Sequence, residues 1–239
     1  LWEGHDIMEV ASPIGWKKNP ELVLDFYNKR RKQLLEVNPN QGHFILAELA
    51  SHFDVHIITQ NVDNLHEKAG SKNVLHLHGE LLKVRSTKDE KYILDWQDDL
   101  LSNHTDPNGF PLRPHIVWFG EDVPAIEEAV DLAEQADFFV VVGTSLQVYP
   151  AAGIMHYTKP ETPVFYIDPN PASVLELANP LEIIPMSGSE GMAVLKHHQK
   201  MGYGEELLFE AENHTVKYFG DLIWFNARVS AVAFYEKSN

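Results

Sequence analysis

The chain has 239 residues, of which 19 are Lys or Arg and 35 are Asp or Glu, so its formal net charge is −16. The length predicts one large domain, or one with a small insert, while the acidic balance argues against nucleic acid and anionic membranes as partners, because both bind basic surfaces. There is no Cys, which excludes disulfides, thiolate zinc sites and Cys nucleophiles. The sequence contains no apolar run long enough to span a membrane and no secretory signal, so we expect a cytoplasmic protein.

Three stretches have the apolar spacing of helices. Residues 20–36 begin with Pro20, which suits a first helical turn, and Leu22, Phe26 and Leu34 recur at roughly helical spacing. Residues 41–53 and 125–136 show a similar pattern. We therefore expect helices in all three ranges.

Short apolar runs rich in β-branched or aromatic residues predict strands at 56–59, 116–119, 138–142, 164–167 and 182–184. Runs that are apolar on both faces are typical of the buried strands of a parallel sheet. Because helical patterns alternate with these runs, the sequence predicts an α/β fold with a Rossmann-like, doubly wound parallel sheet.

Two segments interrupt this rhythm. Residues 84–112 are polar and contain turn signals at 106–109, so we interpret them as a small inserted module. Residues 203–239 follow two glycines and carry apolar clusters, and the sequence assigns them no role. The expected organisation is a main domain over 1–202 and a C-terminal extension over 203–239.

Polar and small residues gather where four of the predicted strands end. These sets are Gln60-Asn61-Val62-Asp63, Phe119-Gly120-Glu121, Gly143-Thr144-Ser145 and Asp168-Pro169-Asn170. In an open parallel sheet, ligands bind outside the carboxyl ends of the strands. Turns favour the same residue types, so one set alone would say little, but four sets together predict one ligand cleft.

The sharpest chemical candidate is His76-Leu77-His78-Gly79-Glu80. A histidine followed by glycine in a loop beside a cleft can act as a general base near neutral pH. A pair of histidines two residues apart also suits a metal, but no third ligand has persuasive spacing. We therefore favour the general base.

Together these motifs resemble the sirtuin family. The resemblance rests on Thr59 to His66, His78-Gly79-Glu80, Val117 to Glu121 and Gly143-Thr144-Ser145, in this order and spacing, and covers roughly residues 1–196. The family consists of NAD-dependent protein-lysine deacylases. The chain looks most like bacterial members that also remove acidic acyl groups.

The resemblance implies a role for each matched position. His78 would be the catalytic base that activates the nicotinamide-ribose hydroxyl. The expected NAD-binding residues are Gln60, Asn61, Val62 and Asp63 at the nicotinamide ribose, Gly143, Thr144 and Ser145 at the phosphate and ribose portion, Asp168, Pro169 and Asn170 at the adenosine ribose, and Gly188 at the adenine. The expected peptide-binding residues are Val117, Phe119, Gly120 and Glu121, facing a second edge at 146–149.

Tyr27 and Arg30 add an argument about the substrate. They are spaced i and i+3 on one face of the 20–36 helix, where a phenol and a guanidinium can bind a carboxylate. From the residues alone, a half-buried Tyr beside a solvated basic run at 29–32 would be the simpler interpretation. In the family, Tyr-x-x-Arg at this place is the mark of desuccinylase and demalonylase activity, which favours carboxylate recognition.

The chain departs from the family in two ways. The zinc-binding cysteines are absent, so no zinc is expected, and the 84–112 module would be stabilised by packing of Tyr92, Ile93, Leu94 and Trp96. The family's opening strand and glycine-rich loop are also absent, and Leu1 matches the position just after them. We therefore expect a truncated chain that lacks a central strand, with 203–239 as a candidate to fill the exposed sheet.

The resemblance implies an NAD-dependent deacylase that removes acetyl and succinyl or malonyl groups from lysine, giving nicotinamide and 2′-O-acyl-ADP-ribose. Acylated proteins or peptides would be the partners. Two alternatives stay open: NAD hydrolysis or ADP-ribosyl transfer at the same site, and an inactive, truncated binding module.

Overall fold

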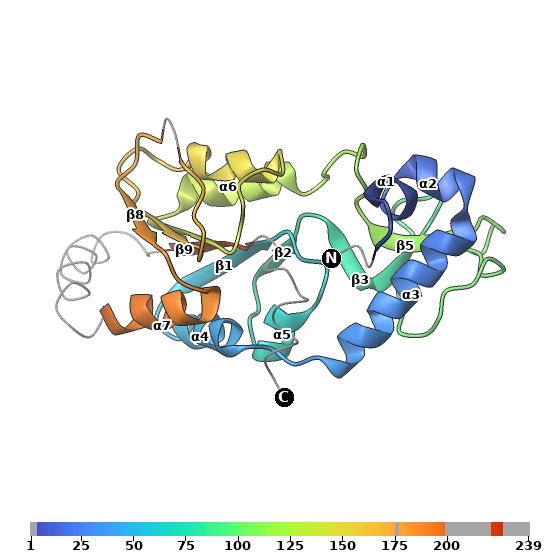
Figure 1. Cartoon of the computed structure of the whole chain (residues 1–239), viewed down its shortest axis with the longest axis horizontal. Coiled ribbons are helices and arrows are strands. Elements are labelled where there is room, and N and C mark those ends of the chain that lie inside the picture. The colour runs from blue at the N-terminus through green and yellow to red at the C-terminus, as the bar shows by residue number, and fades with distance from the viewer. Residues whose placement is uncertain (1–3, 175–176, 199–220, 227–239) are drawn as a thin grey trace.

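A six-stranded parallel sheet forms the larger part of the protein (Figure 1). The computed structural model describes residues 4–174, 177–198 and 221–226. The strand order is β2-β1-β9-β6-β7-β8. The strands are β1 (Asp54–Thr59), β2 (Val74–His76), β6 (Phe138–Val142), β7 (Val164–Ile167), β8 (Leu181–Ile184) and β9 (Asp221–Asn226).

Helices cover both faces of this sheet (Figure 1). One face packs against α6 (Ile126–Gln135) and the 3-10 helix η1 (Ala151–Tyr157), and the other against α4 (Gln41–Leu49) and α7 (Gly188–His198). Successive side chains of β6 alternate between the two cores: Phe139 and Val141 join one, while Val140 and Val142 join the other. The predicted doubly wound α/β fold is therefore confirmed.

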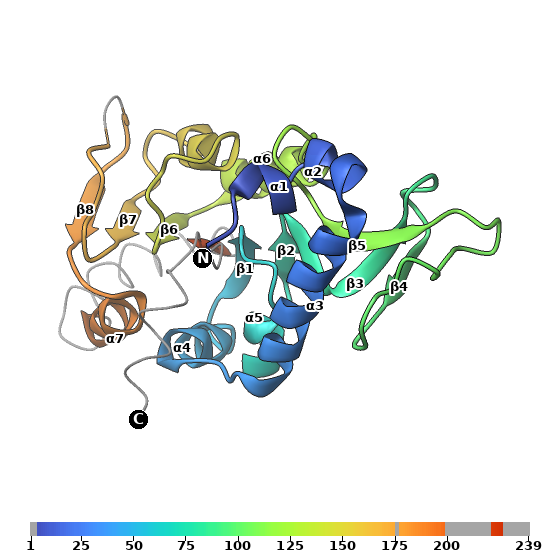
Figure 2. The same ribbon diagram turned by 45° about the vertical axis from the view of Figure 1, so that its right-hand side comes forward.

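A smaller part lies beside the large sheet and contains a three-stranded antiparallel sheet in the order β4-β3-β5 (Figure 2). Its strands are β3 (Gly79–Ser86), β4 (Ile93–Asp95) and β5 (Leu112–Ile116). The helices α1 (Ile7–Val10), α2 (Pro13–Lys18) and α3 (Pro20–Glu36) lie around this sheet, and α5 (Leu65–Ala69) packs beside α4. The strands of the small sheet begin and end a few residues outside the predicted 84–112 module.

The prediction of a parallel strand at 116–119 is wrong. The observed strand β5 ends at Ile116 and pairs antiparallel with β3 in the small sheet. The next residues form a loop in which the Val117 N–H donates to the His78 carbonyl at 2.9 Å. The run is apolar because Trp118, which is 2% exposed, packs among side chains of α1 and α3.

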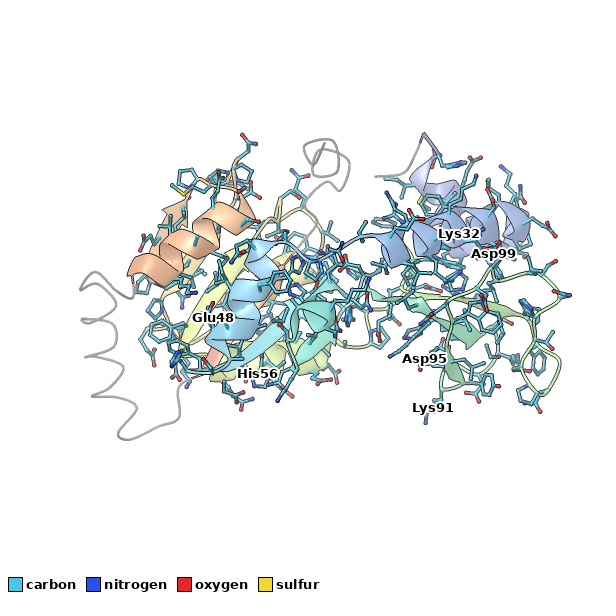
Figure 3. The ribbon with its side chains drawn as sticks, turned by 90° about the horizontal axis from the view of Figure 1, so that it is seen from below. Lys32, Glu48, His56, Lys91, Asp95 and Asp99 are labelled. Carbon is cyan, nitrogen blue, oxygen red and sulfur yellow. The ribbon has the colours of Figure 1, made fainter. Side chains whose placement is uncertain are left out.

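The small module has an apolar core, formed by Val84, Leu100 and Leu112 with Leu24 of α3. Tyr92, Leu94 and Trp96 pack against it, as expected from the sequence. Ile93 does not: its side chain is 41% exposed, because residues of a short strand alternate between two faces and Leu94 takes the inner one. At the rim, Lys32 of α3 forms an ion pair of 2.9 Å with Asp99 (Figure 3).

The C-terminal extension contributes β9 to the centre of the large sheet. Asp221–Asn226 pairs in parallel with β1 on one side and with β6 on the other. The backbone of β9 thus bonds to the inner edges of both neighbours, which would otherwise face each other across a gap. The rest of the extension, including its cluster at 207–209, lies outside the described residues. In the ranges that the structure describes, no helix combines the length and apolar character needed to cross a membrane.

Candidate active site

A cleft of about 660 Å³ opens at the carboxyl ends of β1, β6 and β7, between the large sheet and the small module. Its lining contains almost all of the residues predicted from the sequence. These are Tyr27, Arg30, Gln60, Asn61, Val62, Asp63, His78, Val117, Phe119, Gly120, Glu121, Gly143, Ser145, Asp168, Pro169, Asn170 and Gly188.

Thr144 is the one predicted site residue that does not line the cleft. It is 3% exposed, and its hydroxyl accepts a hydrogen bond from the Leu146 N–H at 3.1 Å. Its carbonyl accepts a hydrogen bond of 2.7 Å from the Tyr166 hydroxyl. Thr144 therefore shapes the loop after β6 from beneath rather than offering a hydroxyl to a ligand.

The loop that follows β1 is held through three consecutive carbonyl groups. The Gln60 carbonyl lies 3.2 Å from Nδ1 of His78, and the Asn61 carbonyl lies 3.2 Å from Nδ1 of His76. The Val62 carbonyl accepts a hydrogen bond of 2.7 Å from the Leu81 N–H. Residues 60–63 thus take their position from the segment that carries the two histidines.

His78 lies in the turn between β2 and β3, as expected from the sequence. The next residue, Gly79, has φ +82°, and a Cβ at this position would lie 2.1 Å from the His115 carbonyl oxygen. Only glycine fits there without displacing the backbone. Because Nδ1 of His78 faces a carbonyl, which can only accept, the neutral ring carries its proton on Nδ1 and its lone pair on Nε2. This tautomer can receive a proton at Nε2.

Gln60 lines the cleft and is itself buried. Its side chain is 4% exposed, and its Nε2 has no hydrogen-bond partner within the described part of the chain. A buried amide donor left without a partner is costly, so a ligand carbonyl or hydroxyl in the cleft would fit it well. Nearby, Oδ1 of Asp63 accepts a hydrogen bond from the Leu65 N–H at 3.1 Å.

The far end of the cleft suits a nucleotide. Gly143 follows β6 with φ 61°, and Gly188 begins α7 so close to β6 that a Cβ would lie 3.0 Å from Cγ1 of Val142. The missing Cβ lets a ligand approach the backbone at Gly143, whereas at Gly188 it lets α7 pack closely against β6 beside the cleft. Asp168 follows β7 directly and is part-exposed, so its carboxylate can accept hydrogen bonds from a ribose diol.

The opposite end of the cleft contains Tyr27 and Arg30 of α3. The Tyr27 hydroxyl accepts a hydrogen bond of 3.0 Å from Nε1 of Trp118, and burial raises the pKa of Tyr27 to about 12. The phenol therefore keeps its proton and can donate it to a group in the cleft. The guanidinium of Arg30 lies 5.4 Å from the centroid of the Phe26 ring.

The simpler interpretation from the residues alone, a solvated basic run at 29–32, does not hold for Arg31, which is fully buried. Its Nε donates to the Leu81 carbonyl at 3.1 Å, and its Nη1 donates to Oδ1 of Asn28 at 2.7 Å. Burial lowers the pKa of Arg31 to about 10, partly opposed by the charge of Asp99. Arg31 thus fixes α3, and with it Tyr27, against the small module.

A buried ion-pair network supports Trp118 from behind. The Arg113 guanidinium stacks 3.4 Å from the Trp118 ring centroid and donates to both carboxylate oxygens of Glu121 at 2.6 and 3.0 Å. The same carboxylate accepts the Trp118 backbone N–H at 2.8 Å. Burial favours the neutral acid, but the bonds from Arg113 outweigh it and lower the pKa of Glu121. The Glu121 carboxylate therefore bonds within the protein, although Glu121 also lines the cleft.

The sequence patterns missed a histidine pair in the cleft wall. His43 of α4 and His66 of α5 have ring centroids 4.6 Å apart, and both line the cleft. Burial lowers the pKa of His43, and burial and the neighbouring His43 lower that of His66 to about 3, so both rings are neutral at pH 7. No sequence signal pairs them, because their contact depends on the packing of α4 against α5. Within the described ranges, no three His, Asp or Glu side chains form a group that could hold a metal ion.

Comparison with known proteins gives consistent results. A sequence model of the Sir2 family matches residues 1–150. An NAD-dependent protein deacylase from Helicobacter pylori (strain J99) is 59% identical over 169 residues, which cover 71% of this chain and 72% of the relative. One from Bacteroides thetaiotaomicron is 48% identical over 202 residues, covering 82% and 86%. A crystal structure described as a Sir2 homolog–NAD complex superposes with a TM-score of 0.75 at 33% identity, covering 84% of this chain and 80% of that one.

Proposed function

The chain belongs to the Sir2 family, and from this premise we propose that its cleft removes acyl groups from lysine side chains with NAD as co-substrate. The observation that carries this proposal is the arrangement around His78. A histidine with its lone pair on Nε2, a loop with a buried amide donor and a glycine-lined nucleotide end all line one cleft.

The residues present fit NAD. The unpartnered amide of Gln60, with Asn61 and Asp63, would hold the nicotinamide ribose, and Gly143, Asp168 and Gly188 would hold the remainder. When bound, NAD supplies an electrophilic ribose carbon and nicotinamide as the leaving group. Asp63 offers a carboxylate and Asn61 an amide oxygen beside that end of the cleft, and such groups stabilise developing positive charge when they are fixed in advance.

In this proposal His78 is the general base. Its Nδ1–H is bonded to the Gln60 carbonyl, which fixes the ring orientation and directs the Nε2 lone pair away from that carbonyl. From there His78 takes a proton from a ribose hydroxyl, so that the hydroxyl can accept the acyl group. The hydrogen bond at Nδ1 also stabilises the imidazolium that forms.

We further propose that Tyr27 and Arg30 select acyl groups that end in a carboxylate, such as succinyl and malonyl. The phenol keeps its proton because burial raises its pKa, and the Trp118 indole occupies its acceptor side. The proton of Tyr27 and the guanidinium of Arg30 would then bind the two sides of a carboxylate.

The peptide itself would lie between the 117–121 loop and residues 146–149. Val117, Phe119, Gly120 and Tyr149 line the cleft, and Tyr149 is 75% exposed. The N–H groups of Val117 and Phe119 donate within the protein, to His78 and Ala11. A peptide strand on this edge would therefore donate its own N–H groups to the carbonyls of the loop.

Nicotinamide release from NAD with acetyl-lysine or succinyl-lysine peptides tests the general activity. Release that requires a peptide supports deacylation. Release without any peptide would indicate NAD hydrolysis instead, and no release with either peptide would refute the enzymatic proposal for this chain.

The acyl preference is tested with Arg30→Met. We expect kcat/KM for the succinyl peptide to fall at least roughly tenfold, because a hydrogen bond to a charged group is lost, while kcat/KM for the acetyl peptide changes little. Lys29→Met is the matched control, since Lys29 lies on the same helix and pairs with the exposed Asp25 at 2.7 Å. Equal loss with both peptides would mean that Arg30 is only structural.

A further inference from the structure

His76 packs against the loop 60–63, and each of its two ring nitrogens faces a hydrogen-bond acceptor. Its Nδ1 lies 3.2 Å from the Asn61 carbonyl oxygen, and its Nε2 lies 2.7 Å from Oε1 of Glu67 on α5. The imidazole is 8% exposed, whereas the Glu67 side chain is 37% exposed. His76 is the last residue of β2 and pairs in register with Thr59, the last residue of β1, which places its ring directly behind Asn61.

This geometry determines the protonation state in which both contacts hold. A backbone carbonyl can only accept, and so can an ionised carboxylate. Both ring nitrogens must therefore donate, so His76 is an imidazolium while both bonds are made. The neutral ring has a single N–H, which favours the charged partner Glu67, and then Nδ1 turns its lone pair toward the Asn61 carbonyl.

The charged groups around His76 support the imidazolium. Burial alone would lower its pKa, but the hydrogen bond and charge of Glu67, with the charge of Glu80, raise it above the ordinary value. His76 in turn outweighs the burial of Glu67 and lowers the pKa of that carboxyl. Two further titratable groups lie near the His76–Glu67 pair. Lys83 forms an ion pair of 2.7 Å with Glu80, and His66 is neutral because its pKa is lowered.

We propose that Glu67 and His76 are positioning residues, and that the Asn61 carbonyl of the NAD-binding loop 60–63 is held in place only while His76 is protonated. The inference rests on the proposed placement of NAD against this loop. His76 does not touch the reacting atoms in this proposal; it acts through Asn61.

The sign of the pH dependence follows. Because the pKa of His76 is raised by its partners, the contact with Asn61 is complete at low pH and is lost as the pH rises through that pKa. NAD affinity should therefore decline on the alkaline side. His78 is present in every variant below, so its own effect on binding is common to all of them.

Two substitutions at position 76 separate the two contacts. Asparagine places its amide nitrogen near the position of Nδ1, so His76→Asn keeps a donor for Asn61 and loses the contact with Glu67. Glutamine reaches the position of Nε2, so His76→Gln keeps a donor for Glu67 and loses the one for Asn61. Neither amide titrates in this range.

NAD binding by calorimetry without a peptide, from pH 6 to pH 8.5, gives the first measurement. We expect the wild-type affinity to fall with rising pH, His76→Asn to bind as the wild type does at pH 6 over the whole range, and His76→Gln to bind roughly tenfold more weakly throughout. Glu67→Gln should also remove the pH dependence, since its amide can donate to Nε2 and leave the proton on Nδ1.

A spectroscopic measurement on the protein without NAD is independent of turnover. The His76 ring signal in NMR should titrate above the ordinary histidine pKa, and the Val62 amide, which follows the Asn61 carbonyl, should shift with the same midpoint. His56→Gln is the matched control, because His56, labelled in Figure 3, forms a similar pair of 3.2 Å with Asp54 of β1 and neither residue lines the cleft. It should leave binding and titration unchanged.

The outcomes distinguish this inference from the proposed function. If His76→Asn and His76→Gln weaken NAD equally, or if both keep the wild-type pH dependence, the positioning role is wrong. Should either variant unfold, the Glu67→Gln comparison decides: a wild-type pH profile in this variant overturns the inference. A wild type that binds NAD with the expected pH dependence but shows no turnover would refute deacylation and leave the inference standing.

Discussion

Gly79→Ala would test the local reason for the position of His78. Gly79 has φ +82°, and its ideal Cβ would lie 2.1 Å from the His115 carbonyl oxygen and 2.9 Å from the carbonyl carbon. These are backbone atoms of β5, paired with β3 through Gly79 and Ile116, so no side chain can rotate away to make room. An alanine must therefore shift one strand against the other.

The expected cost has two parts. A left-handed backbone costs an L-residue about 1–2 kcal/mol, and forcing atoms into a filled space costs about 1–3 kcal/mol more. The free energy of unfolding should therefore fall by about 2–5 kcal/mol. For a chain of this size, each kcal/mol lowers Tm by about 2–4 °C.

Gly109→Ala separates the two parts. Gly109 lies in a turn of the small module with φ +83°, nearly the same as Gly79, but no heavy atom lies within 4 Å of its ideal Cβ. Only the conformational part applies, so we expect a loss of about 1–2 kcal/mol. Because both substitutions restrict the unfolded chain to the same extent, this effect cancels when the two variants are compared. The free energy of urea unfolding lost in Gly79→Ala, minus that lost in Gly109→Ala, therefore measures the steric part.

Deacylase turnover should fall in Gly79→Ala but not in Gly109→Ala. A backbone shift at Gly79 moves the adjacent His78, and displacements of about 1 Å at a catalytic group can lower turnover roughly a hundredfold. If Gly79→Ala proved as mild as Gly109→Ala in both stability and turnover, the argument that close backbone approach fixes His78 would be refuted.

Three further predictions concern other contacts. Trp118→Phe removes the donor to Tyr27 and should lower kcat/KM for a succinyl peptide by about fivefold, with a smaller effect on an acetyl peptide in the same assay. Arg31→Met leaves buried acceptors such as the Leu81 carbonyl without a donor and should lower the free energy of urea unfolding by about 2–3 kcal/mol. The main cause of the lowered pKa of Asp106 is a hydrogen bond from the Ser86 hydroxyl, so Asp106→Asn should reduce Tm at pH 7. The difference in Tm between the wild type and this variant should vanish as the pH falls below the pKa of Asp106, which Tm scans at several pH values would measure.

The sequence predicted the large sheet better than the small one, for a physical reason. The strand at 138–142 is apolar at every position because both of its faces are buried, and few other structures produce such a run. The run at 116–119 looks similar, yet only its first residue is in a strand. Trp118 is buried by α1 and α3, and periodicity cannot distinguish a strand from an extended loop that lies under helices.

The strand order of the large sheet was only partly within reach of the sequence. The missing central strand made 203–239 a candidate to fill the sheet, but the sequence did not indicate which of these residues would pair. The insertion of β9 between β1 and β6 joins residues 54–59 with 221–226, and no local pattern encodes strand order. Buried charge was missed for the same reason. Arg31 appears as part of a basic surface run until Asn28, Leu81 and the Asp98 carbonyl are brought around it by the fold.

The His76-x-His78 motif shows where such sequence interpretation ends. Side chains two residues apart suggested either a metal pair or a single base. In the structure, Nδ1 of His76 bonds to the Asn61 carbonyl and Nδ1 of His78 bonds to the Gln60 carbonyl. The two Nε2 atoms differ in what they must do. His76 must donate from both nitrogens, because Glu67 stands behind it, whereas a base at His78 must keep a lone pair. The same residue type therefore needs opposite protonation states two positions apart. The Glu67 carboxylate on α5, nine residues before His76 in the sequence, makes them differ.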